Sequence, residues 1–298
     1  MSSEEQFCTA PNGIRLCYQT FGDSPADPVV LITGLGAQMM TWEDGFCCDL
    51  VDEGFFVVRL DNRDTGHSTI LDDRPAPNLR ELVLRRIPNP AYTLEDMADD
   101  VVALLDHLGF ASAHIVGASL GGMIAQTLTI RSPQRVRTLV SIMSNTGSLR
   151  SGQMAPALFP YIMRKTPHER DKYVAATAGL LAEVGSKAYP TDIADLTALA
   201  ELQFDRGFSA DGVSRQLGAA MVSGNRTKAL RSVKVPTAVI HGRDDRLIYP
   251  SGGRATAAAI PSATLLEIAG MAHGLPRQLW PQIVGALTFN ARRVVLGF

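Results

Sequence analysis

The sequence predicts an α/β fold, namely a mostly parallel β-sheet covered by helices on both faces, with a helical cap inserted between two of its strands. Two observations carry this prediction. Six short apolar runs, each about as long as a buried strand, alternate with segments of helical periodicity. One long segment, residues 147–230, has helical periodicity but contains no such run. We therefore expect a core made of residues 1–146 and 231–298, and a cap made of residues 147–230.

The predicted strands follow one another along the chain. An alternating stretch over residues 13–22, GIRLCYQTFG, is typical of an edge strand. The six buried runs lie at residues 27–34, 55–60, 112–119, 136–144, 236–242 and 264–270. Because helical segments separate most of these runs, we expect the strands to lie parallel, with their carboxyl ends at one edge of the sheet.

Helices are predicted in the core at residues 42–51, 94–108, 120–133 and 278–292. The second of these has the clearest ends. Thr93 is a favoured N-cap residue, and Gly109 is a favoured residue just past a helix. The last of them has the apolar spacing of an amphipathic helix that packs against the sheet.

The composition excludes several classes of protein. With 298 residues, 46% of them hydrophobic and 19% charged, the chain is expected to fold around a sizeable core. A net charge of −2, with scattered Lys and Arg, argues against a nucleic-acid partner. No apolar run approaches the ~18 residues of a membrane span, and the first residues lack a secretory signal. The four cysteines match no zinc pattern. We expect a cytoplasmic protein without a cofactor or metal.

A serine lies between glycines where a buried run meets a helix. Residues 117–121, GASLG, follow the pattern G-x-S-x-G in the strand–turn–helix context that this motif requires. In so tight a turn, Gly117 and Gly121 avoid clashes with the neighbouring strand and helix. The hydroxyl is held above the sheet, at the positive end of a helix. Ser119 is therefore the predicted nucleophile.

A serine hydroxyl needs a general base, and His273 is the predicted one. It follows the last strand, in GMAHGLP, at the same edge of the sheet. His67, in a polar loop, is the other histidine with a possible functional role. His241 ends a strand and is expected to be structural, beside the site. Surface or structural positions are expected for the remaining histidines, His107, His114 and His168.

The base needs a carboxylate that fixes its tautomer and stabilises the imidazolium. Asp244 and Asp245 follow the strand at 236–242, in HGRDDRLIYP. Asp245 is the preferred acid, and Asp244 is the alternative. Two backbone N–H groups would complete the site as an oxyanion hole. Leu120 follows the nucleophile, and Leu35 lies in the loop TGLG after the first buried strand.

These segments together resemble the α/β-hydrolase superfamily over nearly the whole chain. The segments that show the resemblance are ITGLG, LDNRDTGHS, YTLEDMADDVVALLDHLG, HIVGASLGGMIAQ, HGRDDRLIYP and GMAHGLP. The order Ser119, Asp245, His273 is also the order of that superfamily. RDTGHST and GMAHGLP are most similar to small bacterial serine esterases with a helical cap, such as the aclacinomycin methylesterases, which cleave a methyl ester on a polyketide. In the DNRDTGHS loop, Arg63 and Asp64 are expected to bond to neighbouring backbone.

The resemblance implies a serine hydrolase that cleaves a small or apolar carboxylic ester through an acyl-enzyme, with a small-molecule ester as its partner. The same three residues also fit a carbon–carbon bond hydrolase, a lactonase or a perhydrolase. Carbon–carbon bond hydrolases typically carry a tryptophan after the histidine, where this chain has Gly274. A third hypothesis is a non-enzymatic binding protein on this fold, which would usually lack one member of the triad.

Overall fold

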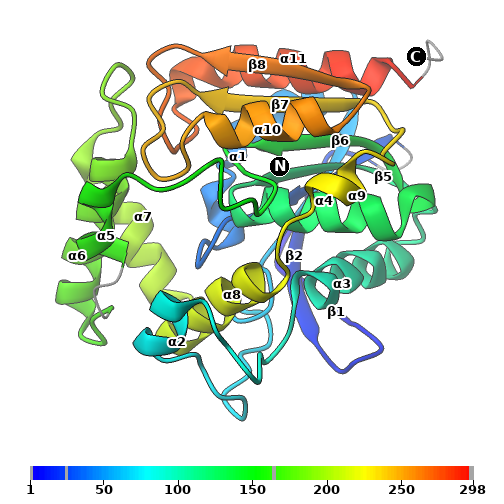
Figure 1. Ribbon diagram of the computed structural model, residues 1–298. Helices are drawn as coiled ribbons and strands as arrows, with labels where there is room; N and C mark the ends of the chain where they lie inside the picture. Colours follow the sequence, from blue (N-terminus) through cyan, green and yellow to red (C-terminus); the bar gives the residue numbers. More distant parts are fainter. Residues whose placement is uncertain (1–2, 24–25, 163–165, 295–298) are drawn as a thin grey trace.

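The structure, a computed structural model, describes residues 3–23, 26–162 and 166–294 (Figure 1). Within these residues one eight-stranded sheet has the order β1-β2-β4-β3-β5-β6-β7-β8. Its strands are β1 (Gln6–Thr9), β2 (Arg15–Phe21), β3 (Asp27–Ile32), β4 (Phe55–Leu60), β5 (Ala113–Ala118), β6 (Val136–Ile142), β7 (Thr237–Gly242) and β8 (Ala263–Ile268). The six strands from β3 to β8 are mutually parallel, as predicted from the six buried runs.

The expectation that residues 13–22 form an edge strand is wrong. β2 pairs antiparallel with β4 on one side and with β1 on the other, so β1 is the edge. The sequence predicts no strand at β1, which pairs with β2 from Gln6 opposite Tyr18 to Thr9 opposite Arg15. β2 is buried along most of its length.

Helices cover both faces of the sheet. The helices of the core are α1 (Asp44–Asp52), α2 (Leu79–Leu84), α3 (Leu94–His107), α4 (Leu120–Arg131), α10 (Ser251–Ala259) and α11 (Trp280–Arg292). Alternate side chains of β3 divide between the two faces. Val30 and Ile32 pack in one core cluster with side chains of α3 and α4, and Val29 and Leu31 pack in another with side chains of α1 and α11. The continuous apolar run of a parallel strand therefore fills two cores at once.

The described residues of the connection from β6 to β7 form helices joined by loops, with no strand among them. The connection contains α5 (Phe159–Ile162), α6 (Arg170–Val184), α7 (Ile193–Asp205), α8 (Ala210–Val222) and α9 (Thr227–Leu230). Helices α5, α6 and α7 stand away from the sheet, at the end toward which β7 and β8 point (Figure 1). This is the end where the carboxyl termini of the parallel strands meet. None of the helices described is both long enough and apolar enough to cross a membrane.

Candidate active site

Ser119 lies on a sharp turn between β5 and α4, in a backbone conformation with φ 55° and ψ −117° that non-glycine residues rarely adopt. The surrounding glycines make this turn possible. A Cβ on Gly117 would lie 2.1 Å from the carbonyl oxygen of Gly121, and a Cβ on Gly121 would lie 2.2 Å from that of Ile32. Ser119 N–H donates to the carbonyl of Ile142, at the end of β6, over 2.9 Å. The motif glycines are therefore required sterically, because backbone passes where their side chains would be.

Three of the predicted site residues come together at the carboxyl ends of the strands. His273 Nε2 lies 3.1 Å from Ser119 Oγ, and His273 Nδ1 lies 2.8 Å from Asp245 Oδ2. A carboxylate can only accept a hydrogen bond, so Nδ1 carries the donated proton and the lone pair of Nε2 faces the serine hydroxyl. This arrangement can remove the proton of Ser119 and return it to a departing group.

Asp245 is fully enclosed and has four hydrogen-bonding neighbours. Its Oδ1 accepts from the backbone N–H groups of Leu247 and Ile248, each over 2.9 Å. Its Oδ2 accepts from His273 and also lies 3.3 Å from Nε2 of His241. Burial alone would raise the pKa of Asp245, but the charge of His273 and the hydrogen bonds from His241, His273 and Ile248 hold that pKa well below its usual value. The carboxylate is therefore ionised across the ordinary pH range.

The alternative acid, Asp244, has an exposed side chain, whereas Asp245 is 1% exposed. His241 lies beside the site as expected, and its contact with Asp245 is a detail that the sequence does not reveal. Of the remaining histidines, His107 and His168 are exposed. His114 is buried and its Nδ1 lies 2.9 Å from Oγ1 of Thr138.

The loop after β3 passes directly beside the serine. A Cβ on Gly34 would lie 3.3 Å from Cβ of Ser119. Leu35 follows in this loop, and Leu120 opens α4 on the other side. Among the described residues, the backbone N–H groups of Leu35 and Leu120 donate no hydrogen bond. An oxyanion hole requires two such unbonded donors.

The sequence predicts that Arg63 and Asp64, in the loop after β4, bond to neighbouring backbone, but the main partners of both side chains are charged side chains. Arg63 donates to the backbone carbonyl of Asp96, but its main partner is the carboxylate of Asp100, with two contacts of 2.6 Å. Asp64 accepts from Leu71 N–H and forms a buried two-point ion pair with Arg215 of α8, at 2.8 and 2.9 Å. The expected backbone bonds are therefore present but secondary.

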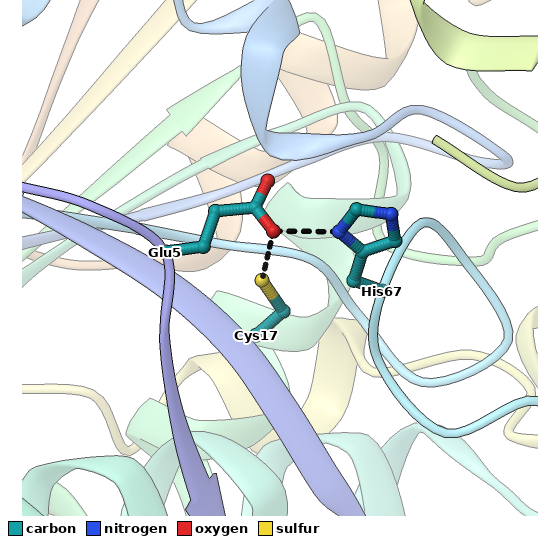
Figure 2. Close-up of side chains that lie close together, drawn as sticks. All are labelled: Glu5, Cys17 and His67. Atoms are coloured by element: carbon teal, nitrogen blue, oxygen red, sulfur yellow. Dashed lines mark hydrogen bonds and ion pairs between the residues drawn. The ribbon is translucent and has the colours of Figure 1, made fainter. Parts of the chain in front are cut away.

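A second polar cluster consists of Glu5, Cys17 and His67, whose side chains point toward one another (Figure 2). Glu5 Oε2 lies 2.6 Å from Nδ1 of His67 and accepts from Sγ of Cys17 over 3.5 Å. These three are atom types that bind metal ions, and they lie within 4.8 Å of one another. Arg206, however, donates to the other oxygen of Glu5 over 2.7 Å. Burial, together with the carboxylates of Asp61 and Glu5, raises the pKa of the Cys17 thiol, which opposes the thiolate that a metal needs. Hydrogen bonds within the chain thus satisfy this cluster, and we assign it no metal.

Comparisons with known proteins identify the family and the fold. A family model described as alpha/beta hydrolase fold matches residues 27–276. Rhodomycin D methylesterase DnrP of Streptomyces peucetius is 27% identical, over 94% of this chain and 95% of that protein. A thermophilic esterase from Thermogutta terrifontis has a TM-score of 0.73 at 22% identity, covering 98% of this chain and 99% of that one. The enol-lactonase of Burkholderia xenovorans LB400 has a TM-score of 0.71 at 23% identity, covering 98% and 100%. The resemblance to bacterial methylesterases is confirmed, and the solved structures share the fold.

Proposed function

Because the chain belongs to the α/β-hydrolase fold family and is a carboxylic ester hydrolase, we propose that it cleaves its substrate through an acyl-enzyme on Ser119. The observation that supports this most directly is the continuous hydrogen-bonded path from Ser119 through His273 to Asp245. Such a path lowers the cost of forming the serine alkoxide, because the proton passes to a base whose charge a buried carboxylate stabilises.

The first half-reaction forms the acyl-enzyme. Ser119 Oγ attacks the ester carbonyl carbon while His273 Nε2 takes its proton. The N–H groups of Leu35 and Leu120 hold the oxygen that becomes negative, each contributing about 3 kcal/mol or more. The tetrahedral intermediate then collapses, the bond to the alcohol oxygen breaks, and His273 returns the proton to the departing alcohol.

The second half-reaction regenerates the serine. Water attacks the acyl carbon as His273 removes one of its protons, and the same two N–H groups stabilise the second tetrahedral intermediate. Collapse releases the carboxylic acid, and the proton on His273 returns to Ser119 Oγ. Asp245 remains ionised throughout and stabilises the imidazolium in both halves.

The substrate we propose is a small or apolar ester that binds beneath a cap formed by residues 147–230, over a core of residues 1–146 and 231–298. Contacts with the loop that carries the base support this role of the segment. His273 N–H donates to the carbonyl of Val184 over 3.0 Å, and Ala272 N–H donates to Oγ of Ser186 over 2.8 Å. Residues of the helical segment thus hold the backbone next to the reacting atoms.

Hydrolysis of p-nitrophenyl butyrate by the wild type and by Ser119→Ala tests the mechanism. We expect turnover by the wild type, its loss in a folded Ser119→Ala variant, and a fluorophosphonate adduct at Ser119 of the wild type only. Unchanged turnover by Ser119→Ala contradicts the mechanism, and absence of any adduct favours a binding protein on this fold.

A substrate panel tests the kind of bond that is cleaved. It should contain p-nitrophenyl esters of increasing chain length, methyl esters of aromatic acids, lactones and vinylogous 1,5-diketones. We expect the highest kcat/KM with a short-chain or methyl ester. Preferential opening of lactones, or cleavage of the diketones, would reassign the same three residues to a lactonase or a carbon–carbon bond hydrolase.

A further inference from the structure

Buried side chains hold the backbone at Thr33 and at Gly36, before and after Leu35. On one side, the amide nitrogen of Asn62 donates to the carbonyl and the hydroxyl of Thr33, each over 3.1 Å. On the other, the N–H of Gly36 donates to Oε1 of Gln216 over 2.9 Å. Leu35 itself donates no backbone hydrogen bond among the described residues. Its N–H belongs to the Gly34–Leu35 peptide, whose carbonyl accepts from the N–H of Ala37 over 3.2 Å.

Gln216 is positioned to hold this loop rigidly. Its side chain is completely buried, and both ends of its amide are used. Oε1 accepts from Gly36, and Nε2 donates to the carbonyl of Arg63 over 2.7 Å. The preceding residue, Arg215, fixes α8 through its ion pair with Asp64. Gln216 therefore joins the loop after β3 to the loop after β4 through a helix that lies 180 residues further along the chain than Gly36.

The loop needs such a contact, because glycines flank Leu35. Gly36 has φ +64°, in the left-handed region that glycine adopts freely, and a Cβ there would lie 2.8 Å from Cγ2 of Val213 on α8. If the Gly36 N–H were released, the backbone on both sides of Leu35 could rotate about the glycine dihedral angles at low cost, including the Gly34–Leu35 peptide that carries Leu35 N–H. The stabilisation of an oxyanion depends on donors that already point at the developing charge, so such rotation would lower the rate.

From this geometry we infer that Gln216 is a positioning residue for the oxyanion hole: by holding the Gly36 amide it limits movement of the adjoining Gly34–Leu35 peptide, so that the N–H of that peptide, on Leu35, faces the carbonyl oxygen of the substrate. The inference rests on the mechanism proposed above for Ser119. It also makes α8, an element of the helical segment, part of what sets the rate of the chemical step. Gln216 itself does not touch the substrate.

The decisive variant is Gln216→Met, which keeps the length of the side chain and removes both hydrogen bonds. We expect kcat on p-nitrophenyl butyrate to fall by about 10- to 100-fold, less than the 10²- to 10³-fold loss of a whole oxyanion donor. KM should stay within about twofold. The affinity for a trifluoromethyl ketone, whose carbonyl accepts Ser119 Oγ to form a hemiketal oxyanion, should fall by the same factor as kcat.

Asn290→Leu is the matched control. Asn290 is also a completely buried amide, which donates to the backbone carbonyls of Leu139 and Pro236, but it lies on α11. Its loss should lower the melting temperature and leave kcat and inhibitor affinity unchanged. If Gln216→Met does not fold, Gln216→Asn takes its place. In the wild type, slow hydrogen exchange of the Gly36 amide tests the bond without any substitution.

The outcomes separate this inference from the proposed function. If the wild type neither hydrolyses esters nor reacts with a fluorophosphonate, both the proposed function and this inference are contradicted. An active wild type with an unchanged kcat and inhibitor affinity in the folded Gln216 variants overturns the inference alone. Equal losses in the Gln216 and Asn290 variants also overturn it, since they would indicate a general effect on stability. Fast exchange of the Gly36 amide overturns it as well, since the bond to Gln216 would then not hold this amide.

Discussion

His273 Nε2 lies within hydrogen-bond distance of Ser119 Oγ, at 3.1 Å, although 154 residues separate them in the sequence. The contact joins two loops that leave different strands of the sheet, β5 and β8. It exists only when the whole set of parallel strands between them is assembled. Reactivity of Ser119 is therefore a property of the folded sheet, and each prediction below separates an effect on chemistry from an effect on folding.

Ser119→Gly should remove turnover and yet raise stability above that of Ser119→Ala. Ser119 has φ 55°, a conformation that costs any residue with a Cβ about 1–3 kcal/mol and that glycine adopts freely. Urea denaturation of the two inactive variants measures the difference. Equal stabilities of the two would mean that the turn stores no backbone strain.

Asp245→Asn should lower kcat by roughly 10⁴-fold without unfolding the protein, because an amide can stabilise the wrong tautomer of His273 and cannot stabilise an imidazolium. The depressed pKa of Asp245 means that its carboxylate is already ionised, so the loss should appear across the neutral pH range. Asp244→Asn is the control, since Asp244 is exposed and should behave like the wild type. A larger loss in the Asp244 variant would exchange the two roles.

Gly121→Ala should prevent folding or leave the protein insoluble. The added Cβ would lie 2.2 Å from the carbonyl oxygen of Ile32 and 2.6 Å from that of Thr33, and both contacts are with backbone rather than with a flexible side chain. Gly285→Ala, in α11, is the matched substitution, because no atom lies within 4 Å of its new Cβ. It should stabilise the protein by up to about 1 kcal/mol through helix propensity. Soluble yield and urea denaturation distinguish the two, and a well-folded Gly121→Ala would contradict the close approach.

His114 should make stability depend on pH. Burial lowers the pKa of His114 from 6.5 to about 4, with Asp27 partly offsetting and Arg137 adding to the shift. A histidine whose pKa is lower in the folded state contributes stability that is fully present above its unfolded pKa of about 6.5 and is lost as the pH falls toward 4. Over that window the loss should be on the order of 3 kcal/mol.

His114→Gln should therefore flatten the curve of unfolding free energy against pH between 6.5 and 4, compared with the wild type. The control is His107→Gln, at an exposed histidine on α3. Its curve should run parallel to that of the wild type. Parallel curves for all three proteins would show that His114 does not titrate as its burial requires.

The sequence predicts the parts of the fold that depend on local pattern. The six buried strands follow from continuous apolar runs, and the place of Ser119, Asp245 and His273 at one edge follows from parallel topology. It does not predict β1, whose four residues are too short for a recognisable alternation. Without β1, β2 could only be assigned as the edge. The short helix α2 is also missed, although Asn78 and Glu81 form a capping box at its start.

The contacts that complete the candidate site cannot be predicted from single segments of the sequence. Gln216 meets Gly36, and His241 meets Asp245, only because the sheet and the helical segment bring distant loops together. A glutamine in the middle of an amphipathic helix has no feature that marks it as the partner of a backbone N–H. Its complete burial in the folded chain is the first indication of its role.

Exchange of residues 147–230 between relatives is an obvious way to build chimaeras with altered substrate choice. Gln216 and Arg215 limit such recombination, because they lie in the exchanged segment. Their partners, Gly36 and Asp64, lie in the part of the chain that is not exchanged. A transplanted segment brings its own side chains to these loops. Chimaeras that take α8 and the loops after β3 and β4 from the same parent should therefore be active more often than chimaeras in which residues 147–230 alone are exchanged.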